Sequence, residues 1–355
     1  MKKINFYLLT ILIIFGFCSK VSAQDFEDWL SNFKNYALQK GISENTINNV
    51  MNNVKYLPDV IKYDRYQPEF YENTKTYVNK RSSKEKVIIG KKIYKDNFDL
   101  INKVSKEFNV DKELLLSLMG IETNFGKYLG KMDIISSLST LSYDKRRSEF
   151  FTNELIKILK LIDDGVIDHK TLYGSWAGAF GNFQFMPSTI MNYAIDYNND
   201  KQINLKSYED SFASAANYIN KLGWNPDEPC FLRVDLLDST PQYLLNSSAK
   251  KISNKKKFKE IKKYIKNADN IIFNENLMVG IITPDKEIVE NPDPFNPAFI
   301  TFQNYELILK WNRSLRFGLA VCTLKDKFKN ALKNIYIVNA FFKLLLDTSC
   351  KDKRY

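Results

Sequence analysis

Residues 111–126 read DKELLLSLMGIETNFG, and this stretch decides how the middle of the chain folds. It opens with an aspartate, a good helix N-cap residue, and continues as an apolar run of good helix formers. Leu115, Leu118 and Met119 precede Glu122 at offsets that share one face of an α-helix. A carboxylate among apolar side chains is costly unless it is paired or used. The pattern therefore predicts a helix that carries Glu122 near its end, either as a functional acid or as a salt-bridged or solvent-facing side chain.

Residues 174–188 read GSWAGAFGNFQFMPS, a loop rich in glycine and aromatic residues that is suited to holding a flat polymer. An apolar setting raises the pKa of a carboxyl group and keeps the acid protonated, as general acid catalysis requires. The loop and Glu122 together predict an enzyme that cleaves a glycosidic bond. Within the loop, the structural alternatives are that Ser175 caps a Gly-rich turn and that Gln184 ties the loop to itself.

The composition of the chain excludes some other kinds of site. The chain has 355 residues, of which 44% are hydrophobic and 26% are charged, so it can bury a sizeable core in two or three domains. It contains 1 histidine, His169, which excludes His-rich zinc sites. Any Ser-His-Asp or Cys-His site would depend on His169, which lies in a polar stretch expected to be an exposed loop.

The N-terminus has the pattern of a secretory signal peptide over residues 1–23. Two lysines precede an apolar stretch at 6–17, which is too short to span a bilayer comfortably, and the small residues 21–23 form a cleavage site. Gln24 would then begin the mature protein, and an uncleaved anchor is the alternative. Cys18 follows a phenylalanine instead of a small residue, which disfavours a lipoprotein. We therefore expect a protein of the periplasm or cell envelope, where a disulfide can form among the three remaining cysteines.

The charge of the chain suggests the kind of partner. The formal net charge of +11 falls to +8 when the three lysines of the leader are removed. A basic exported protein suits an acidic polymer or an anionic envelope surface. Nucleic acid is a poor fit for an exported chain, and no later stretch has the pattern of a transmembrane helix.

The composition and hydrophobic pattern of the sequence change along the chain, and these changes predict its domains. Residues 24–95 are expected to form a helical domain, and residues 96–225 are mostly helical and carry the glycine loop. Prolines punctuate short apolar runs over 226–297, which predicts a small β-rich insert. Residues 298–348 return to helix and would close the core.

Several motifs in the chain resemble those of the B-type membrane-bound lytic transglycosylases of bacterial cell walls. Besides the two segments above, they are QPEF at 67–70, LSTLSY at 138–143, RRSEFF at 146–151, NY at 217–218, GW at 223–224 and WNRS at 311–314. The motifs follow the order of that family and cover nearly the whole mature chain. The resemblance implies an α+β, mainly α fold with a lysozyme-like core, a helical N-terminal domain and a small β-rich insert.

The same resemblance implies a substrate and a reaction. The family cleaves the peptidoglycan glycan strand between N-acetylmuramic acid and N-acetylglucosamine without adding water, and it leaves 1,6-anhydromuramoyl ends. Glu122 would be the single catalytic acid and base, and no cofactor is required for the chemistry. The residues expected to bind substrate are Ser175, Gln184, Phe183, Trp311 and Phe317. A non-catalytic murein-binding scaffold and a lysozyme-type hydrolase are the alternatives.

One departure from the family concerns its late motif, which resembles Tyr-Asn-x-Ser-x-x-Tyr. Trp311 and Phe317 stand at the two tyrosine positions, so both phenol hydroxyls are absent. A role of those hydroxyls in positioning substrate or polarising Glu122 cannot be carried over, whereas the aromatic surfaces remain for stacking.

A second departure concerns a possible structural calcium site. The expected oxygen ligands are Asp196, Asn198, Asp200, the backbone carbonyl of Gln202, and Asp210, which the family's version of this loop would use as its last carboxylate. Lysine stands at position 201, where glycine normally makes the sharp turn, and serine stands at position 207, where an EF-hand has glutamate. We expect a weak site that takes no part in chemistry, and an ion-free turn rich in Asp and Asn is the alternative.

Overall fold

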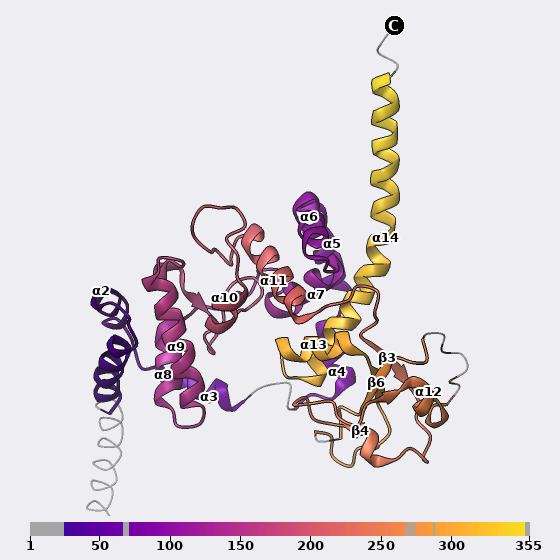
Figure 1. Cartoon of the computed structure of the whole chain (residues 1–355), viewed down its shortest axis with the longest axis horizontal. Coiled ribbons are helices and arrows are strands. Elements are labelled where there is room, and N and C mark those ends of the chain that lie inside the picture. Colours follow the sequence, from indigo (N-terminus) through magenta and orange to yellow (C-terminus); the bar gives the residue numbers. More distant parts are fainter. Residues whose placement is uncertain are drawn as a thin grey trace, which may run out of the picture. The chain divides into compact units, whose positions relative to one another are not determined.

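The computed structural model describes residues 25–66, 71–266, 268, 271, 274–286 and 288–351, with side chains described as far as residue 333. The predicted signal peptide and the QPEF motif at 67–70 lie outside these residues. The chain divides into two compact units, one made of Met1–Tyr66 and Leu129–Ser211 and the other of Gln67–Tyr128 and Phe212–Tyr355. Figure 1 colours the elements of both units by their place in the sequence.

The first unit is mostly helical. Its elements are a helix over 25–39, α2 (Glu44–Thr46), the π-helical turn η1 (Ile47–Met51), α3 (Pro58–Arg65), β1 (Met132–Asp133), α8 (Ile134–Tyr143), α9 (Ser148–Asp163), the 3₁₀ turn η3 (His169–Thr171), β2 (Tyr173–Gly174) and α10 (Pro187–Tyr193). Helix α8 is buried along almost its whole length and packs against α9, beside which it lies in Figure 1. Asp133 starts α8 by accepting a hydrogen bond from the backbone N–H of Ser136 at 2.7 Å. The short strands β1 and β2 pair antiparallel and fix the start of the glycine loop, because Met132 lies opposite Gly174.

The second unit combines helices with a small sheet. Its helices and turns are α4 (Thr74–Arg81), α5 (Lys84–Asp96), α6 (Phe98–Phe108), α7 (Lys112–Thr123), α12 (Phe258–Ile261), α13 (Gln303–Trp311), α14 (Leu315–Lys351) and the 3₁₀ turns η4 (Gln242–Leu244) and η5 (Lys262–Tyr264). Helix α11 (Tyr208–Leu222) begins in the first unit and continues into the second. Helix α7, which carries Glu122, packs mainly against α14.

The sheet is built from β3 (Phe231–Val234), β4 (Leu245–Asn246), β5 (Lys256–Lys257), β6 (Met278–Ile282) and β7 (Ala298–Thr301). Its order is β3-β7-β6-β4, with β5 beside β6; β7 is antiparallel to both of its neighbours, and β4 runs parallel to β6. The sheet confirms the β-rich character predicted between residues 226 and 297, and it extends through β7 to Thr301. The predicted division at residues 95, 225 and 297 stays a prediction, since the two compact units group the chain differently.

Two further features bear on the predictions. Cys230, next to β3, forms a disulfide with Cys322 of α14, with the two Cα atoms 6.1 Å apart. Within the described ranges, no helix is both long enough and apolar enough to cross a membrane.

Candidate active site

Glu122 occupies the last turn of α7, where the chain turns sharply out of the helix. Asn124, Phe125 and Gly126 have φ angles of 51°, 61° and 81°, so the helix cannot continue past Thr123. The backbone N–H groups of Asn124 and Phe125 both donate to the carbonyl of Met119, the latter at 3.2 Å. This left-handed exit leaves the Glu122 side chain half-buried. The sequence prediction of a helix ending at this acid is therefore confirmed.

Trp311, at the end of α13, holds one oxygen of Glu122. Its indole Nε1–H donates to Oε1 of Glu122 at 2.9 Å. The indole ring stacks on Tyr218 with centroids 5.1 Å apart and planes at 25°, and the hydroxyl of Tyr218 donates to the carbonyl of Lys310 at 3.3 Å. An indole is a donor only, so Oε1 is an acceptor whenever this bond is made. The bond therefore makes the two oxygens of the Glu122 carboxyl group unequal.

The sequence predicted an aromatic surface at position 311 but no hydrogen bond. Because the family hydroxyl is absent, its possible polar contact with Glu122 could not be carried over to this chain. The structure instead gives Trp311 an N–H donor at the carboxylate, so the larger side chain supplies a hydrogen bond of its own.

Lys86, on α5, binds the C-terminal end of α7 and was not singled out from the sequence. Its ammonium donates to the carbonyl of Gly120 and to Oδ1 of Asn124, the second at 2.9 Å. Burial lowers the pKa of Lys86, and the nearby charge of Arg81 lowers it further. A cation at a helix C-terminus also interacts favourably with the helix dipole. Lys86 therefore fixes the helix end that presents Glu122.

Asp111 occupies the N-cap position of α7, as predicted, but its side chain makes no capping bond. Its Oδ2 atom accepts a hydrogen bond from the indole Nε1–H of Trp224 at 2.9 Å instead. A tertiary partner has replaced the local one, which is why local spacing could not predict the bond. Both ends of α7 thus carry a carboxylate bonded to a tryptophan indole.

Ser175, in the first unit, lies in a tight turn of the glycine loop. Its Oγ accepts from the N–H of Ala179 at 3.1 Å, and its own N–H donates to the carbonyl of Ala179 at 2.8 Å. Gly178 permits this turn because its φ is 85° and a Cβ there would fall 2.4 Å from Leu138. The structure thus shows the capping role that the sequence left open, and the hydroxyl hydrogen of Ser175 remains a donor.

Gln184 lies in a hairpin in which Phe180 and Phe185 exchange backbone hydrogen bonds of 3.0 and 2.9 Å. The Nε2 group of Gln184 donates to the carbonyls of Gly181 at 3.0 Å and Leu129 at 3.3 Å. Gln184 thus ties the loop to itself through its nitrogen, and its amide oxygen is the atom suited to accept from a sugar hydroxyl.

Asn182 anchors the same hairpin and was missed by the sequence analysis. It is only 2% exposed, and its Nδ2 group donates to the carbonyl of Lys206 at 3.1 Å and to Oγ of Ser211 at 3.0 Å. A polar residue between glycine and phenylalanine gives no signal of these contacts, since the partners lie more than twenty residues away. Asn182 is therefore the structural support of the loop.

Phe183 and Phe317 lie in the predicted motifs, but their rings are buried and cannot stack on a sugar. Their exposed fractions are 2% and 3%. The physical reason is that both rings complete apolar packing, Phe183 within the hairpin and Phe317 in the first turn of α14. We interpret them as residues that support their loops.

The predicted residues fall into two groups. Glu122, Trp311 and Phe317 belong to one compact unit, and Ser175, Phe183 and Gln184 belong to the other. Within its own unit, the structure joins Glu122 to Trp311 directly.

The predicted calcium loop is held by its own backbone. The two carboxylate oxygens of Asp196 accept from the N–H groups of Asp200 at 3.1 Å and Lys201 at 2.8 Å. Asp200 in turn accepts from the N–H of Gln202 at 2.9 Å and from the Nδ2 group of Asn198 at 3.0 Å. Lys201 has a φ of 74°, so it adopts the left-handed conformation for which glycine is usual.

Asp210 is fully buried beside this loop. Its two oxygens accept from the N–H groups of Tyr197 and Asn204, each at 2.8 Å. Across the described part of the chain, no three or more Asp, Glu, His or Cys side chains gather as they would around a metal ion. The residue types and the turn fit calcium, whereas the carboxylates do not converge on one point.

Comparisons with known proteins give a consistent match. A family model described as "Transglycosylase SLT domain" matches residues 25–326. Membrane-bound lytic murein transglycosylase B of Escherichia coli (strain K12) is 39% identical over 127 residues, which cover 36% of this chain and 35% of that protein. The aligned region thus spans about a third of the length of the curated relative.

Solved structures resemble the chain over most of its length. SltB3 from Pseudomonas aeruginosa in complex with NAG-NAM-pentapeptide has a TM-score of 0.76 and 29% identity, covering 86% of this chain and 79% of that one. Lytic transglycosylase Slt35 of Escherichia coli in complex with calcium has a TM-score of 0.71 and 24% identity, covering 85% and 93%. These neighbours confirm the predicted mainly helical, lysozyme-like fold with small sheets.

Proposed function

Because this chain belongs to the transglycosylase SLT domain family, we propose that it is a lytic transglycosylase that cleaves peptidoglycan between N-acetylmuramic acid and N-acetylglucosamine without adding water. The observation that supports this reaction is the half-buried Glu122, fixed at a helix end and hydrogen-bonded to Trp311. The proposed substrate is consistent with the SltB3 neighbour, whose crystals contain a NAG-NAM-pentapeptide.

Glu122 acts in both steps of the proposed reaction. It first donates the proton on Oε2 to the bridging oxygen, and the bond from that oxygen to C1 of the muramic acid breaks. The substrate's acetamido group stabilises the oxocarbenium-like centre. The Glu122 carboxylate then removes the proton of the 6-hydroxyl, whose oxygen bonds to C1 and closes the 1,6-anhydro ring. Water must be kept away, since it would compete with that hydroxyl.

The other predicted site residues act on the substrate or on Glu122. Trp311 orients the Glu122 carboxylate, and its ring forms part of the substrate surface. The hydroxyl hydrogen of Ser175 and the amide oxygen of Gln184 bind sugar groups. Phe183 and Phe317 support the loops that carry these residues. The support for this assignment is the loop geometry within each unit.

The envelope location and the calcium site complete the proposal. The protein is exported by residues 1–23 and acts in the periplasm or envelope, where a basic surface suits the acidic groups of the wall. N-terminal sequencing of the mature protein should begin at Gln24, and another first residue would correct the cleavage site. Asp196, Asn198 and Asp200, with the carbonyl of Gln202 and with Asp210, would hold a weak structural calcium ion. The ion would stabilise the loop and take no part in the reaction.

Mass spectrometry of digested sacculi tests the reaction directly. Anhydromuropeptides are the expected products. Muropeptides with a reducing muramic acid end would indicate a hydrolase instead. Release of no fragments, with retained binding to sacculi, would indicate a murein-binding scaffold.

A further inference from the structure

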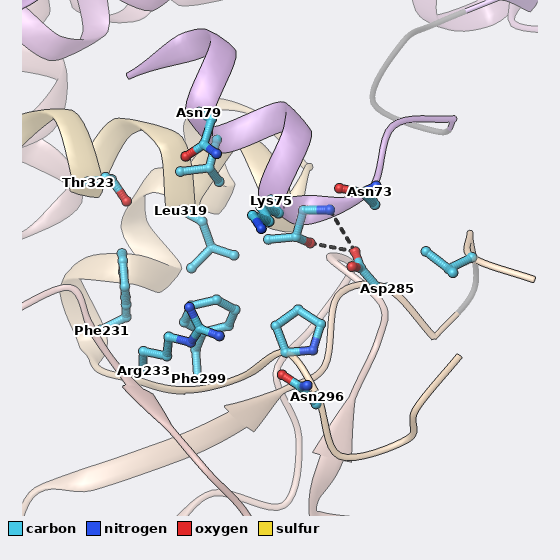
Figure 2. A pocket seen from close by; sticks show the side chains of 14 residues that line it. Asn73, Lys75, Asn79, Phe231, Arg233, Asp285, Asn296, Phe299, Leu319 and Thr323 are labelled. Atoms are coloured by element: carbon cyan, nitrogen blue, oxygen red, sulfur yellow. Dashed lines mark hydrogen bonds between the residues drawn. The ribbon is translucent and has the colours of Figure 1, made fainter. Parts of the chain in front are cut away.

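A cavity of about 660 Å³ lies within the second unit and includes none of the proposed catalytic residues. Figure 2 shows its side chains, which come from α4, β3, β7, α14 and the segment that contains Asp285 and Asn296. Its size is within the usual range for small-molecule sites. It is therefore large enough to enclose a short peptide or a molecule of similar size.

The floor of the cavity is apolar because of the strand register. Phe231 and Arg233 lie two residues apart on β3 and share one face, and Arg233 pairs with Phe299 of β7. The rings of Phe231 and Phe299 meet edge to face with centroids 5.4 Å apart. Leu319 of α14 points toward Phe299 from the opposite side in Figure 2. The cavity therefore offers a surface for small apolar groups.

The rim of the cavity carries positive charge. Lys75 and Arg233 are exposed, and among the residues that the structure describes neither has a hydrogen-bond or ion-pair partner. Among the lining residues that the structure describes, Asp285 is the one carboxylate, and it is already neutralised. It accepts from the N–H of Thr74 and from Nη2 of Arg316, both at 2.9 Å, and Figure 2 shows its bonds to Thr74. Two cations therefore face the cavity without a matching negative charge among its described lining residues.

Three uncharged polar side chains complete the lining: Asn79, Asn296 and Thr323. Their side chains likewise have no hydrogen-bond partner among the described residues. Amide and hydroxyl groups of this kind pair with peptide N–H and C=O groups. A purely aliphatic anion would satisfy the cations but leave these groups unpaired once it excluded water from them.

We propose that this cavity binds an anionic peptide with small apolar side chains, and specifically the peptide stem of peptidoglycan. The carboxylates of the stem match the two cations, and its alanine methyl groups match the apolar floor. Its short peptide backbone matches the uncharged polar side chains of the lining. The choice of the stem among acidic peptides rests on the proposed function. The site would select strands that still carry their peptides.

Binding of the free tetrapeptide L-Ala-γ-D-Glu-meso-diaminopimelate-D-Ala, measured by calorimetry on the full mature chain, tests the site. The double variant Lys75→Gln with Arg233→Gln should weaken binding by about 10-fold, because it removes two charged contacts. Lys251→Gln with Lys259→Gln is the matched control, since it makes the same change in net charge at exposed positions outside the cavity. This control should bind like the wild type.

Cleavage of glycan strands stripped of their peptides separates failure of this inference from failure of the proposed function. Anhydro products without tetrapeptide binding would overturn the peptide site and leave the reaction standing. Tetrapeptide binding that the Lys75 and Arg233 changes do not weaken would place the peptide elsewhere and also overturn the inference. Binding lost in the double variant supports the site, even if the stripped strands are not cleaved and the reaction fails. Decanoate serves as a purely aliphatic anion. If it bound more tightly than the tetrapeptide, the proposal that the ligand is a peptide would be wrong.

Discussion

Glu122 has two carboxylate oxygens that the structure makes unequal. Oε1 accepts the indole N–H of Trp311, which has no lone pair to offer in return. The proposed mechanism accordingly places the proton of the acid form on Oε2 and returns a proton to the same oxygen. In that mechanism, the Trp311 hydrogen bond determines which oxygen of Glu122 transfers the proton.

Glu122→Gln should abolish cleavage while the protein still folds and binds sacculi. The substitution keeps the size of the side chain but removes the transferable proton, and general acid-base catalysis contributes roughly 10²–10⁴-fold. Product release from sacculi measures the rate, and Glu113→Gln on the same helix is the control. Turnover near that of the wild type would end the assignment of Glu122.

Trp311→Phe should lower kcat by roughly 10- to 150-fold with little change in KM, since a hydrogen bond to a charged group contributes about 1.5–3 kcal/mol. The phenyl ring keeps an aromatic surface but loses the donor. Trp224→Phe is the matched control, because Trp224 also donates to a carboxylate but to that of Asp111. If both variants keep the wild-type kcat, the indole does not position Glu122.

The sequence could predict Glu122 but not its partner. The apolar offsets along one helix pointed to the acid, because local spacing determines which side chains share a helix face. The bond from Trp311 joins residues 189 positions apart, and no local rule reports such a contact. The family motif could not supply the contact either, because the role of the missing phenol hydroxyls could not be carried over to this chain.

At the scale of elements, the loop from Asp196 to Asp210 shows how backbone geometry can satisfy acidic side chains. Its carboxylates accept backbone N–H groups, and Lys201 adopts the left-handed conformation at φ 74°. The sequence predicted the residue types of a calcium loop. It could not predict that lysine would make the turn, because the surrounding hydrogen bonds offset the strain.

Chelation by EDTA should lower the melting temperature by a few degrees and leave the cleavage products unchanged, since a weak site contributes about 1 kcal/mol of stability at modest calcium. Asp200→Ala should melt lower than the wild type and should not respond to EDTA. The loop is an ion-free turn if neither EDTA nor Asp200→Ala changes the melting temperature.

The disulfide between Cys230 and Cys322 joins the start of β3 to α14 across 92 residues. Cys230→Ala with Cys322→Ala should lower the free energy of unfolding by roughly 2–5 kcal/mol, because the long loop gains freedom in the unfolded chain. Urea denaturation measures the loss, and Cys350→Ala is the control that should change little. An unchanged midpoint in the double variant would contradict a stabilising role. The odd number of cysteines left this pairing open in the sequence.

At the scale of the whole molecule, the order of the motifs predicted the fold class, because several separate segments matched the same family in the same order. The domain bounds predicted from the sequence group the chain differently from the two compact units, and they stay a prediction. Each unit combines two separate stretches, 25–66 with 129–211 and 71–128 with 212–351 over the described residues. Changes of composition along a chain locate segment boundaries, but they do not report which distant segments pack into one unit.

The bond between Cys230 and Cys322 also has a consequence in time. Thiols stay reduced in the cytoplasm and oxidise in the bacterial periplasm. If the chain is exported as proposed, a newly made copy lacks this disulfide until it reaches an oxidising compartment. For a protein proposed to cut the wall of its own cell, the disulfide would therefore form only after the chain has crossed the membrane. Trapping free thiols at intervals after synthesis would time that step.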